Sequence, residues 1–322
     1  MKAIQVKQPG GPEALQLVEL PDPVAGAGQV LVEVHAAGVN FIDVYHRTGH
    51  YKVDLPFTPG MEGAGVVLAT GEGVTDFRPG DRVAWAMSRG AYAQKALVPA
   101  NLLVKLAESV SFEAAAAAML QGMTAHYLTH STFPLQEGQT ALVHAAAGGA
   151  GRLVVQMAKM KGARVIGTVG SEAKEKIARA AGCDEVIRYD ETDFVAGVKD
   201  FSGSQGVDVV YDSVGKSTFE KGLDVLRRRG MMVLFGQSSG PVAPFDPNVL
   251  NQKGSLFVTR PSLAYYTSAP EELAWRAGDV LRWLGQGTLT LLIDRKYPLS
   301  NAGDAHRDLE GRRTAGKLLL IP

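Results

Sequence analysis

Apolar and polar residues alternate along the first third of the chain. Residues 29–35 (QVLVEVH) carry valine at every second position, as half-buried strands do, and residues 63–68 (GAGVVL) form a short apolar run that suits a buried strand. Clusters of proline and glycine, which are typical of turns, separate these segments at residues 9–12, 59–60 and 79–81. Short strands joined by regular turns predict a compact β barrel or sandwich over residues 1–110.

The pattern changes at residue 111, where an alanine-rich segment of high helix propensity begins. From there on, short apolar runs alternate with segments of helical periodicity. The runs that predict strands are residues 140–144, 163–169, 185–188, 207–211, 231–235 and 254–258. The segments that predict helices are residues 149–161, 172–181, 193–201 and 217–229. This alternation predicts an α/β fold, with βαβ units and a doubly wound parallel sheet covered by helices on both faces.

The end of the chain predicts a return to the first domain. Residues 271–286 have helical periodicity, and residues 316–321 (GKLLLI) predict a strand. A strand so late in the sequence cannot easily extend the parallel sheet, so we expect it to pair within the N-terminal domain. The predicted domains are therefore residues 1–120 together with 262–322, and an inserted parallel-sheet domain at residues 121–261.

The composition of the chain argues against several classes of function. The 322 residues include 33 Lys and Arg against 33 Asp and Glu, and a chain without net charge offers no field that gathers nucleic acid or an anionic membrane. No apolar run approaches the about 18–20 residues of a membrane-spanning helix. The single cysteine, Cys183, excludes an internal disulfide and any zinc site built on two cysteines, and its acidic neighbours suit a structural thiol. We therefore expect a cytoplasmic protein without nucleic-acid or membrane partners.

The strongest motif is a glycine-rich turn at residues 144–152 (HAAAGGAGR). Ala146, Gly148 and Gly151 have the spacing of G-x-G-x-x-G, with alanine at the first position, and the motif follows a predicted strand and opens a predicted helix. Small residues let the backbone approach a pyrophosphate, and the start of the helix supplies free amides. The motif favours a dinucleotide site over the alternative, a glycine-rich turn without a ligand.

The end of the next strand indicates which dinucleotide binds. Sites that prefer NAD usually place an acidic residue there to hold the ribose 2′-hydroxyl. This chain has Ser171 instead, followed one turn later by Lys174. A hydroxyl and a cation suit a 2′-phosphate, so we predict NADP(H). The alternative is that Lys174 is an ordinary solvated helix residue.

Five segments together resemble one enzyme family. They are residues 38–43 (GVNFID), 60–65 (GMEGAG), 145–151 (AAAGGAG), 211–215 (YDSVG) and 251–261 (NQKGSLFVTRP). Over its whole length the chain resembles the quinone oxidoreductases, the zeta-crystallin-like, zinc-independent branch of the medium-chain dehydrogenases/reductases. The resemblance implies a Rossmann domain inserted into a GroES-like, mostly β catalytic domain, with NADPH as cofactor. It also implies a homodimer, for which the predicted strand at residues 254–258 is a candidate interface.

The resemblance also implies the site residues. Catalytic roles fall to Asn40, Tyr45 and Tyr51, which would hydrogen-bond the developing oxyanion of a quinone. Gln121 stands where some relatives have lysine, and Asp43 and Glu62 are expected to be structural hydrogen-bonding groups. The residues expected at the cofactor are Asn40, Tyr45, Thr124, Gly148, Gly149, Ala150, Gly151, Gly170, Ser171, Lys174, Tyr189, Gly215, Gly236, Ser238, Phe257 and Val258.

No metal is expected in the site. Zinc-dependent relatives have a ligand cysteine where Asn40 stands and a ligand histidine where Met61 stands, and neither residue here suits zinc. The histidine pairs 46/50 and 126/130 have i,i+4 spacing, which leaves a metal role open, but they lack the context of a known metal motif.

The expected reaction is hydride transfer from NADPH to a quinone, in which the protein supplies proximity and orientation. One alternative is an NADPH-dependent alkenal or enoyl reductase, which needs a positioned proton donor for carbon. Another is an NADPH-binding structural or sensing protein with negligible turnover.

Overall fold

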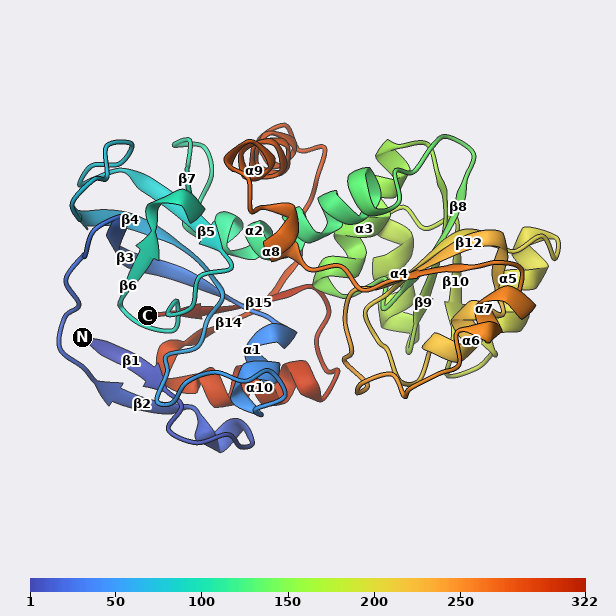
Figure 1. Ribbon diagram of the computed structural model, residues 1–322, viewed down its shortest axis with the longest axis horizontal. Helices are drawn as coiled ribbons and strands as arrows, with labels where there is room; N and C mark the ends of the chain where they lie inside the picture. The colour runs from blue at the N-terminus through green and yellow to red at the C-terminus, as the bar shows by residue number, and fades with distance from the viewer. The chain divides into compact units, whose positions relative to one another are not determined.

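The protein is described by a computed structural model that covers residues 1–322. The chain forms two compact units, drawn with their elements labelled in Figure 1. Unit 1 comprises Met1–Met123 and Thr267–Pro322, and unit 2 comprises Thr124–Tyr266. The chain leaves unit 1 within helix α2 (Phe112–Tyr127) and returns after α8 (Leu263–Tyr266). These boundaries lie a few residues beyond the predicted ones, because α2 continues past residue 120.

Unit 1 is built on a seven-stranded sheet with the order β14-β15-β3-β4-β5-β7, to which β6 is added through β3. The strands are β3 (Gln29–Val39), β4 (Glu62–Thr70), β5 (Arg82–Ala86), β6 (Lys95–Pro99), β7 (Leu103–Lys105), β14 (Ile293–Pro298) and β15 (Lys317–Ile321). A separate two-stranded sheet pairs β1 (Lys2–Gln5) with β2 (Gln16–Glu19). The helices that belong wholly to this unit are α1 (Phe41–Arg47), α9 (Pro270–Gly285) and α10 (Ala302–Glu310).

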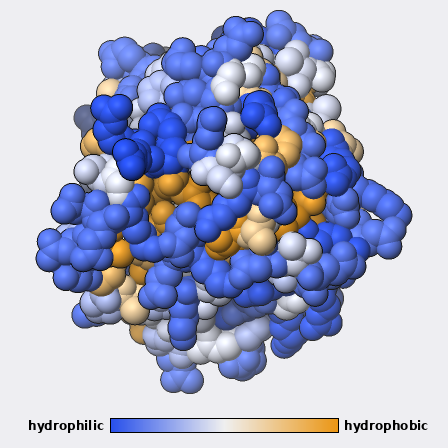
Figure 2. Space-filling model, turned by 90° about the vertical axis from the view of Figure 1, so that its right-hand side faces the viewer, coloured by the Kyte–Doolittle hydropathy of each residue, from blue (hydrophilic) through white to orange (hydrophobic).

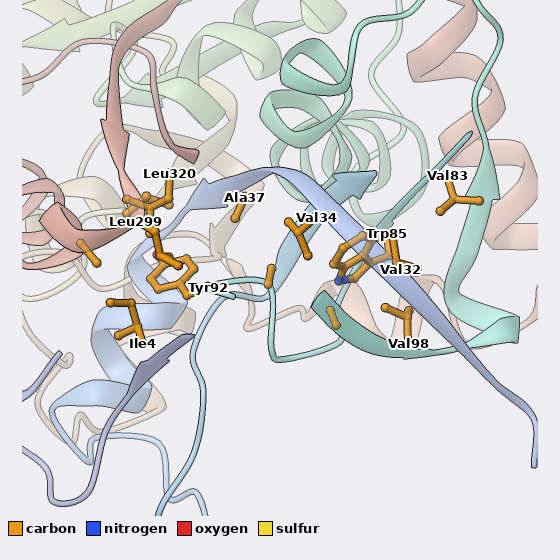
Figure 3. Packing of buried hydrophobic residues seen from close by; sticks show 14 of the residues in the cluster. Ile4, Val32, Val34, Ala37, Val83, Trp85, Tyr92, Val98, Leu299 and Leu320 are labelled. Carbon is orange, nitrogen blue, oxygen red and sulfur yellow. The ribbon is translucent and has the colours of Figure 1, made fainter. Parts of the chain in front are cut away.

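The predicted alternation in residues 29–35 is confirmed in β3. Val30, Val32 and Val34 are buried, whereas Glu33 and His35 on the opposite face are exposed. Figure 3 shows Val32 and Val34 beside Trp85 in the cluster of buried apolar residues that fills this unit. The sheet is therefore held by one apolar face, as the period of two requires.

The C-terminal strand returns to the first domain as predicted. β15 pairs antiparallel with β3, with Leu318 opposite Val39, and parallel with β14. Leu318, Leu319 and Leu320 are all buried, which explains the continuous apolar run that marks the end of the chain.

Unit 2 contains the predicted parallel sheet, in the order β10-β9-β8-β11-β12-β13. Its strands are β8 (Thr140–His144), β9 (Arg164–Val169), β10 (Glu185–Arg188), β11 (Val207–Asp212), β12 (Leu226–Leu234) and β13 (Phe257–Thr259). Its helices are α3 (Gly149–Met160), α4 (Glu172–Ala180), α5 (Phe194–Ser202), α6 (Phe219–Leu223), α7 (Asn248–Gln252) and α8. The strand order reverses at β8, which is the topological switch point where open α/β sheets bind ligands.

Two predicted elements of unit 2 are wrong in extent. The helix predicted at residues 217–229 ends at Leu223, because β12 already begins at Leu226. Leu226 pairs with Val207, and Arg227 forms an ion pair with Asp208 of the neighbouring strand, with Nε 2.7 Å from Oδ1. The strand predicted at residues 254–258 is shorter and lies later, at Phe257–Thr259 of β13. At residues 224–229, sheet pairing outweighs the local helical periodicity.

Figure 2 shows apolar side chains gathered in a band, bordered by hydrophilic ones, on the side of the molecule where unit 2 is drawn. The large apolar side chains of this unit that are exposed are Tyr189, Phe245, Phe257 and Tyr265. No helix of the protein has the length and apolar character needed to cross a membrane.

Candidate functional site

The glycine-rich turn of unit 2 joins β8 to α3 and has the shape of a phosphate cradle. Gly148 is the N-cap of α3, so the backbone amides that follow it belong to the first turn and lack intrahelical acceptors. Gly151 packs against the turn itself, since a Cβ there would lie 2.3 Å from the carbonyl oxygen of Ala145. Only glycine permits this approach of helix and strand. The positive end of the helix dipole adds to the attraction for an anion, so the turn fits the diphosphate of a dinucleotide.

The residues predicted around a 2′-phosphate follow the neighbouring strands β9 and β10. Ser171 is the N-cap of α4, where its Oγ accepts a hydrogen bond from the amide of Lys174 at 3.3 Å. Tyr189 follows β10 and lies against Gly170, because a Cβ on Gly170 would be 2.4 Å from the phenol oxygen. The register of β9 with β10 brings both strand ends to the same edge of the sheet. The hydrogen bond from the Lys174 amide uses only a lone pair of the Ser171 hydroxyl oxygen. The hydroxyl proton of Ser171 can therefore still be donated to an anion.

The loops after β11 and β12 are held together at the same edge. Asp212 is fully buried, and its Oδ1 accepts hydrogen bonds from the amides of Val214 at 2.7 Å and Gly215 at 3.0 Å. The amide of Ser238 donates to the carbonyl of Ser213 at 3.1 Å. Gly236 packs as closely, since a Cβ there would lie 2.6 Å from that carbonyl oxygen. The structure thus brings these glycines and Ser238 to the carboxyl ends of the strands, as expected.

Phe257 and Val258, which are expected at the cofactor, are the first two residues of the short strand β13. Phe257 pairs with Met231 in the body of the sheet, before the end of β12 at Leu234. Its side chain is 55% exposed. Thr124, the first residue of unit 2, is buried within α2.

In unit 1, Asn40 is held by a complete set of hydrogen bonds. Its Oδ1 accepts from Lys317 Nζ at 2.8 Å and from Gln121 Nε2 at 3.2 Å. Its Nδ2 donates to Glu62 Oε2 at 2.9 Å and to the carbonyl of Gly38 at 3.3 Å. An amide side chain offers two donors and two lone pairs, and all four are used here. A bond from Asn40 to a substrate would require one of these partners to be released.

Lys317, which lies beside Asn40, is not among the residues predicted for the site. Lys317 is 2% exposed, Glu62 is fully buried, and the two form an ion pair with Nζ 2.5 Å from Oε2. Glu62 Oε1 also accepts a hydrogen bond from the amide of Leu120 at 2.6 Å. The two charged residues are 255 positions apart in sequence, so no local pattern could have revealed the pair.

A second buried polar chain holds α1 in place. Asp43 accepts from the amides of Asn40 and Met61 and from the Tyr92 hydroxyl, at 2.9, 3.0 and 3.2 Å. Burial raises the pKa of Asp43 to about 7, although these donors and the charge of Lys317 oppose the shift. Asp43 and Glu62 are both fully buried and accept hydrogen bonds from backbone amides; their role as purely structural groups stays a prediction.

The same chain continues from Tyr92 toward the surface. The Tyr92 hydroxyl lies 3.2 Å from His306 Nε2, and His306 Nδ1 lies 3.2 Å from Arg47, which forms two hydrogen bonds with Glu310. Burial and, as a smaller cause, the nearby guanidinium of Arg47 together lower the pKa of His306 to about 3. His306 is therefore a neutral link between Arg47 and Tyr92.

Tyr45 and Tyr51 form an aromatic cluster at the C-terminal end of α1. Their ring centroids are 5.2 Å apart, and the Tyr51 amide donates to the carbonyl of Tyr45 at 3.0 Å. His50 lies beside both rings, with centroids 5.7 Å from Tyr45 and 5.3 Å from Tyr51. The structure thus brings two of the three predicted catalytic residues together through their rings.

No group of three or more His, Cys, Asp or Glu side chains in the protein could hold a metal ion. Cys183 is a free, buried thiol, and burial together with the charge of Asp184 raises its pKa to about 12. This agrees with the prediction of a structural thiol. His126 and His130 stack on each other with centroids 4.3 Å apart.

Comparison with known proteins identifies the family. The family model "Alcohol dehydrogenase GroES-like domain" matches residues 26–108, and "Zinc-binding dehydrogenase" matches residues 149–273. Quinone oxidoreductase 1 of Escherichia coli (strain K12) is 44% identical over 99% of this chain and 99% of its own length. A 2-haloacrylate reductase of a Burkholderia species is 41% identical over 99% and 98% of the two chains. The solved structure of Escherichia coli quinone oxidoreductase complexed with NADPH has a TM-score of 0.98, with 44% identity and 100% of both chains covered.

The GroES-like and parallel-sheet domains predicted from the resemblance are confirmed by these matches. Relatives of this identity and coverage share the whole architecture of the chain, not one domain alone. The chain therefore belongs to the quinone oxidoreductase family of the medium-chain dehydrogenases/reductases.

Proposed function

We propose that this protein is an NADPH-dependent quinone reductase. The observation that carries the proposal is the edge of the parallel sheet, where a phosphate cradle at Gly148–Gly151 is followed by Ser171 and Lys174 instead of an acidic residue. Full-length relatives named quinone oxidoreductase, one of them solved in complex with NADPH, support the same conclusion.

The residues present fit the cofactor. The amides of Gly149, Ala150 and Gly151 would hold the diphosphate, because they lie in the first turn of α3 and have no acceptor within the helix. Ser171, Lys174 and Tyr189 with Gly170 would surround the 2′-phosphate. Gly215, Gly236 and Ser238 would line the rest of the dinucleotide along the strand ends, and Asn40, Tyr45 and Thr124 its nicotinamide half. For Phe257 and Val258, their place within β13 weakens the expected contact.

When bound, NADPH supplies a hydride, which together with one proton converts a quinone to a hydroquinone. The chain would contribute orientation and donors for the developing oxyanion. Tyr45 and Tyr51 are the stronger candidates for these donors, since both Asn40 amide protons are already bonded to Glu62 and Gly38. Asn40 is then a positioning residue, and the reaction proceeds without a metal.

The test is a substrate panel with the purified protein. Loss of NADPH absorbance is followed with a series of quinones, and in parallel with alkenals and 2-haloacrylate, using NADH as the cofactor control. We expect the highest kcat/KM with a quinone and with NADPH. Turnover of the activated alkenes alone would replace this proposal with a double-bond reductase. NADPH binding without turnover of any acceptor would point to a structural or sensing protein.

The double-bond reductase is the second candidate because a relative named 2-haloacrylate reductase is 41% identical over nearly the whole chain. Such a reaction requires a proton donor at carbon after hydride delivery. Tyr45 and Tyr51 of the α1 aromatic cluster are the candidates for this donor. A solvent isotope effect on kcat that disappears in Tyr45→Phe would favour this candidate.

We also propose that the protein is a homodimer that pairs through β13. This strand is the edge of the six-stranded sheet, and Phe257 on it is 55% exposed. An edge strand with an exposed aromatic residue is a surface that another chain can extend. Phe257→Lys is expected to convert a dimer to a monomer in sedimentation experiments.

We also propose that the protein is located in the cytoplasm, which cell fractionation would test.

A further inference from the structure

One buried arginine of unit 2 has no anion to neutralise it. The protein buries three arginines, Arg47, Arg152 and Arg276. Arg47 pairs with Glu310 at 2.8 Å, and Arg276 pairs with Glu272 at 2.6 Å. Arg152 is 9% exposed, and its Nε is buried without a hydrogen-bond partner. Burial is the only influence on its pKa, which is lowered, so no nearby carboxylate compensates the charge. Burying an unpaired charge is costly, so its presence points to an anion that binds there.

The position of Arg152 in α3 places it at the phosphate cradle. Its amide donates to the carbonyl of Gly148, the N-cap, at 2.9 Å, so the residue lies one turn into the helix. Helical side chains tilt toward the N-terminus, and an extended arginine is longer than the about 5.4 Å rise of one turn. The guanidinium can therefore reach the level of the cradle amides.

The face of α3 that carries Arg152 can be located from a second residue. Lys159 lies seven positions later, which is the same face of a helix with 3.6 residues per turn. Its Nζ bonds Asp184 at 2.8 Å, and its side chain contacts Gly182, in the segment that follows α4. Arg152 thus lies on the side of α3 that faces α4. This is the side on which Ser171 and Lys174 begin the next helix.

We propose that Arg152 is a ligand of the diphosphate bridge of NADPH, supplementing the backbone amides of the cradle with a fixed positive charge. The inference rests on the proposed function for its ligand. Backbone amides carry only partial charges, whereas a guanidinium donates charge-assisted bonds to two phosphate oxygens at once. Because the Arg152 side chain is itself buried, its attraction for a phosphate is little screened by salt.

The experiment compares Arg152→Met with Arg179→Met. Both variants remove one positive charge from unit 2, but Arg179 is 46% exposed on the surface of α4 and pairs only with acidic surface residues. Dissociation constants are measured by titration calorimetry for NADPH, for NADH and for adenosine 2′-monophosphate, which has a 2′-phosphate but neither phosphate of the diphosphate bridge. Thermal unfolding of each ligand-free protein is recorded alongside.

We expect Arg152→Met to weaken NADPH and NADH equally, by about 10- to 100-fold, as the loss of a charge-assisted hydrogen bond does. The affinity for adenosine 2′-monophosphate stays close to that of the unchanged protein. The ligand-free variant melts at a higher temperature, because the uncompensated charge is gone. Arg179→Met changes none of the three affinities.

Other outcomes overturn the inference. An unchanged NADPH affinity in Arg152→Met, or a ligand-free protein that melts lower with unaltered affinities, makes Arg152 a structural residue. A loss of affinity confined to NADPH and adenosine 2′-monophosphate assigns Arg152 to the 2′-phosphate instead. The proposed function fails separately, if the unchanged protein binds NADPH but reduces no quinone.

Discussion

Replacing Lys317 with methionine tests the buried ion pair of unit 1. Methionine fills a similar volume but carries no charge, so Glu62 would keep only the hydrogen bonds from Asn40 and from the amide of Leu120. Both charged residues are almost completely buried, at 2% and 0% exposure. The variant therefore leaves a carboxylate in the interior without a counter-charge.

The magnitude follows from the separation of the charges. With Nζ 2.5 Å from Oε2, an effective dielectric constant of about 20 gives an attraction of about 7 kcal/mol. Removing the lysine charge also removes the free-energy cost of burying that charge, which offsets part of the lost attraction. The net cost of breaking a buried ion pair is generally about 3–5 kcal/mol. At about 2–4 °C per kcal/mol for a domain of this size, Tm should fall by roughly 6–20 °C.

The assay is thermal unfolding of three variants beside the unchanged protein. Lys296→Met is the matched control, because Lys296 pairs with Glu113 at 2.6 Å but is 50% exposed. Exposed pairs contribute about 0–1 kcal/mol, so this variant should shift Tm little. The double variant Lys317→Met with Glu62→Gln should recover part of the loss, since it leaves no buried charge unpaired. A Tm for Lys317→Met equal to that of Lys296→Met would refute the reasoning, and a double variant no more stable than Lys317→Met would assign the loss to packing.

Three further predictions concern the cofactor, the reaction and pH. Lys174→Ala should weaken NADPH binding about tenfold in titration calorimetry, because one charge-assisted hydrogen bond is lost, and should leave the affinity for NADH unchanged. Equal losses of affinity for both cofactors would contradict a 2′-phosphate role. Tyr45→Phe should lower the kcat for quinone by less than about tenfold, because a quinone needs little acid catalysis; abolished turnover with intact NADPH binding would make Tyr45 an essential acid. Since the pKa of His306 is lowered from 6.5 to about 3, folding stability should be fully present above pH 6.5 and decline as the pH falls toward 3. His306→Asn should flatten that decline in Tm, and an unchanged slope would show that other groups cause it.

Local patterns in the sequence were sufficient for the architecture of both units. Strand β3 is recognisable because its valines recur with the period that buries one face of a sheet. The cradle is recognisable because Gly148 and Gly151 meet steric demands set by residues within the same turn. The apolar tail could be assigned to the first domain, since a strand so late in the chain had no place in the parallel sheet. At Leu226 the local helical pattern competes with pairing in the parallel sheet, and the helix predicted there is wrong.

The arrangement of buried charges was decided only by the tertiary structure. Lys317 reads in the sequence as a polar residue at the start of a strand, and Arg152 as an ordinary cation early in a helix. Pairing β15 with β3 brings Lys317 to Asn40 and Glu62, hundreds of residues away in sequence. Packing of α3 removes Arg152 from water without giving it an acidic partner. Sequence periodicity determines which faces are buried, because it acts over one or two turns. Which charged side chains pair with each other, and which are buried without a counter-charge, depends on contacts that form only when the chain folds.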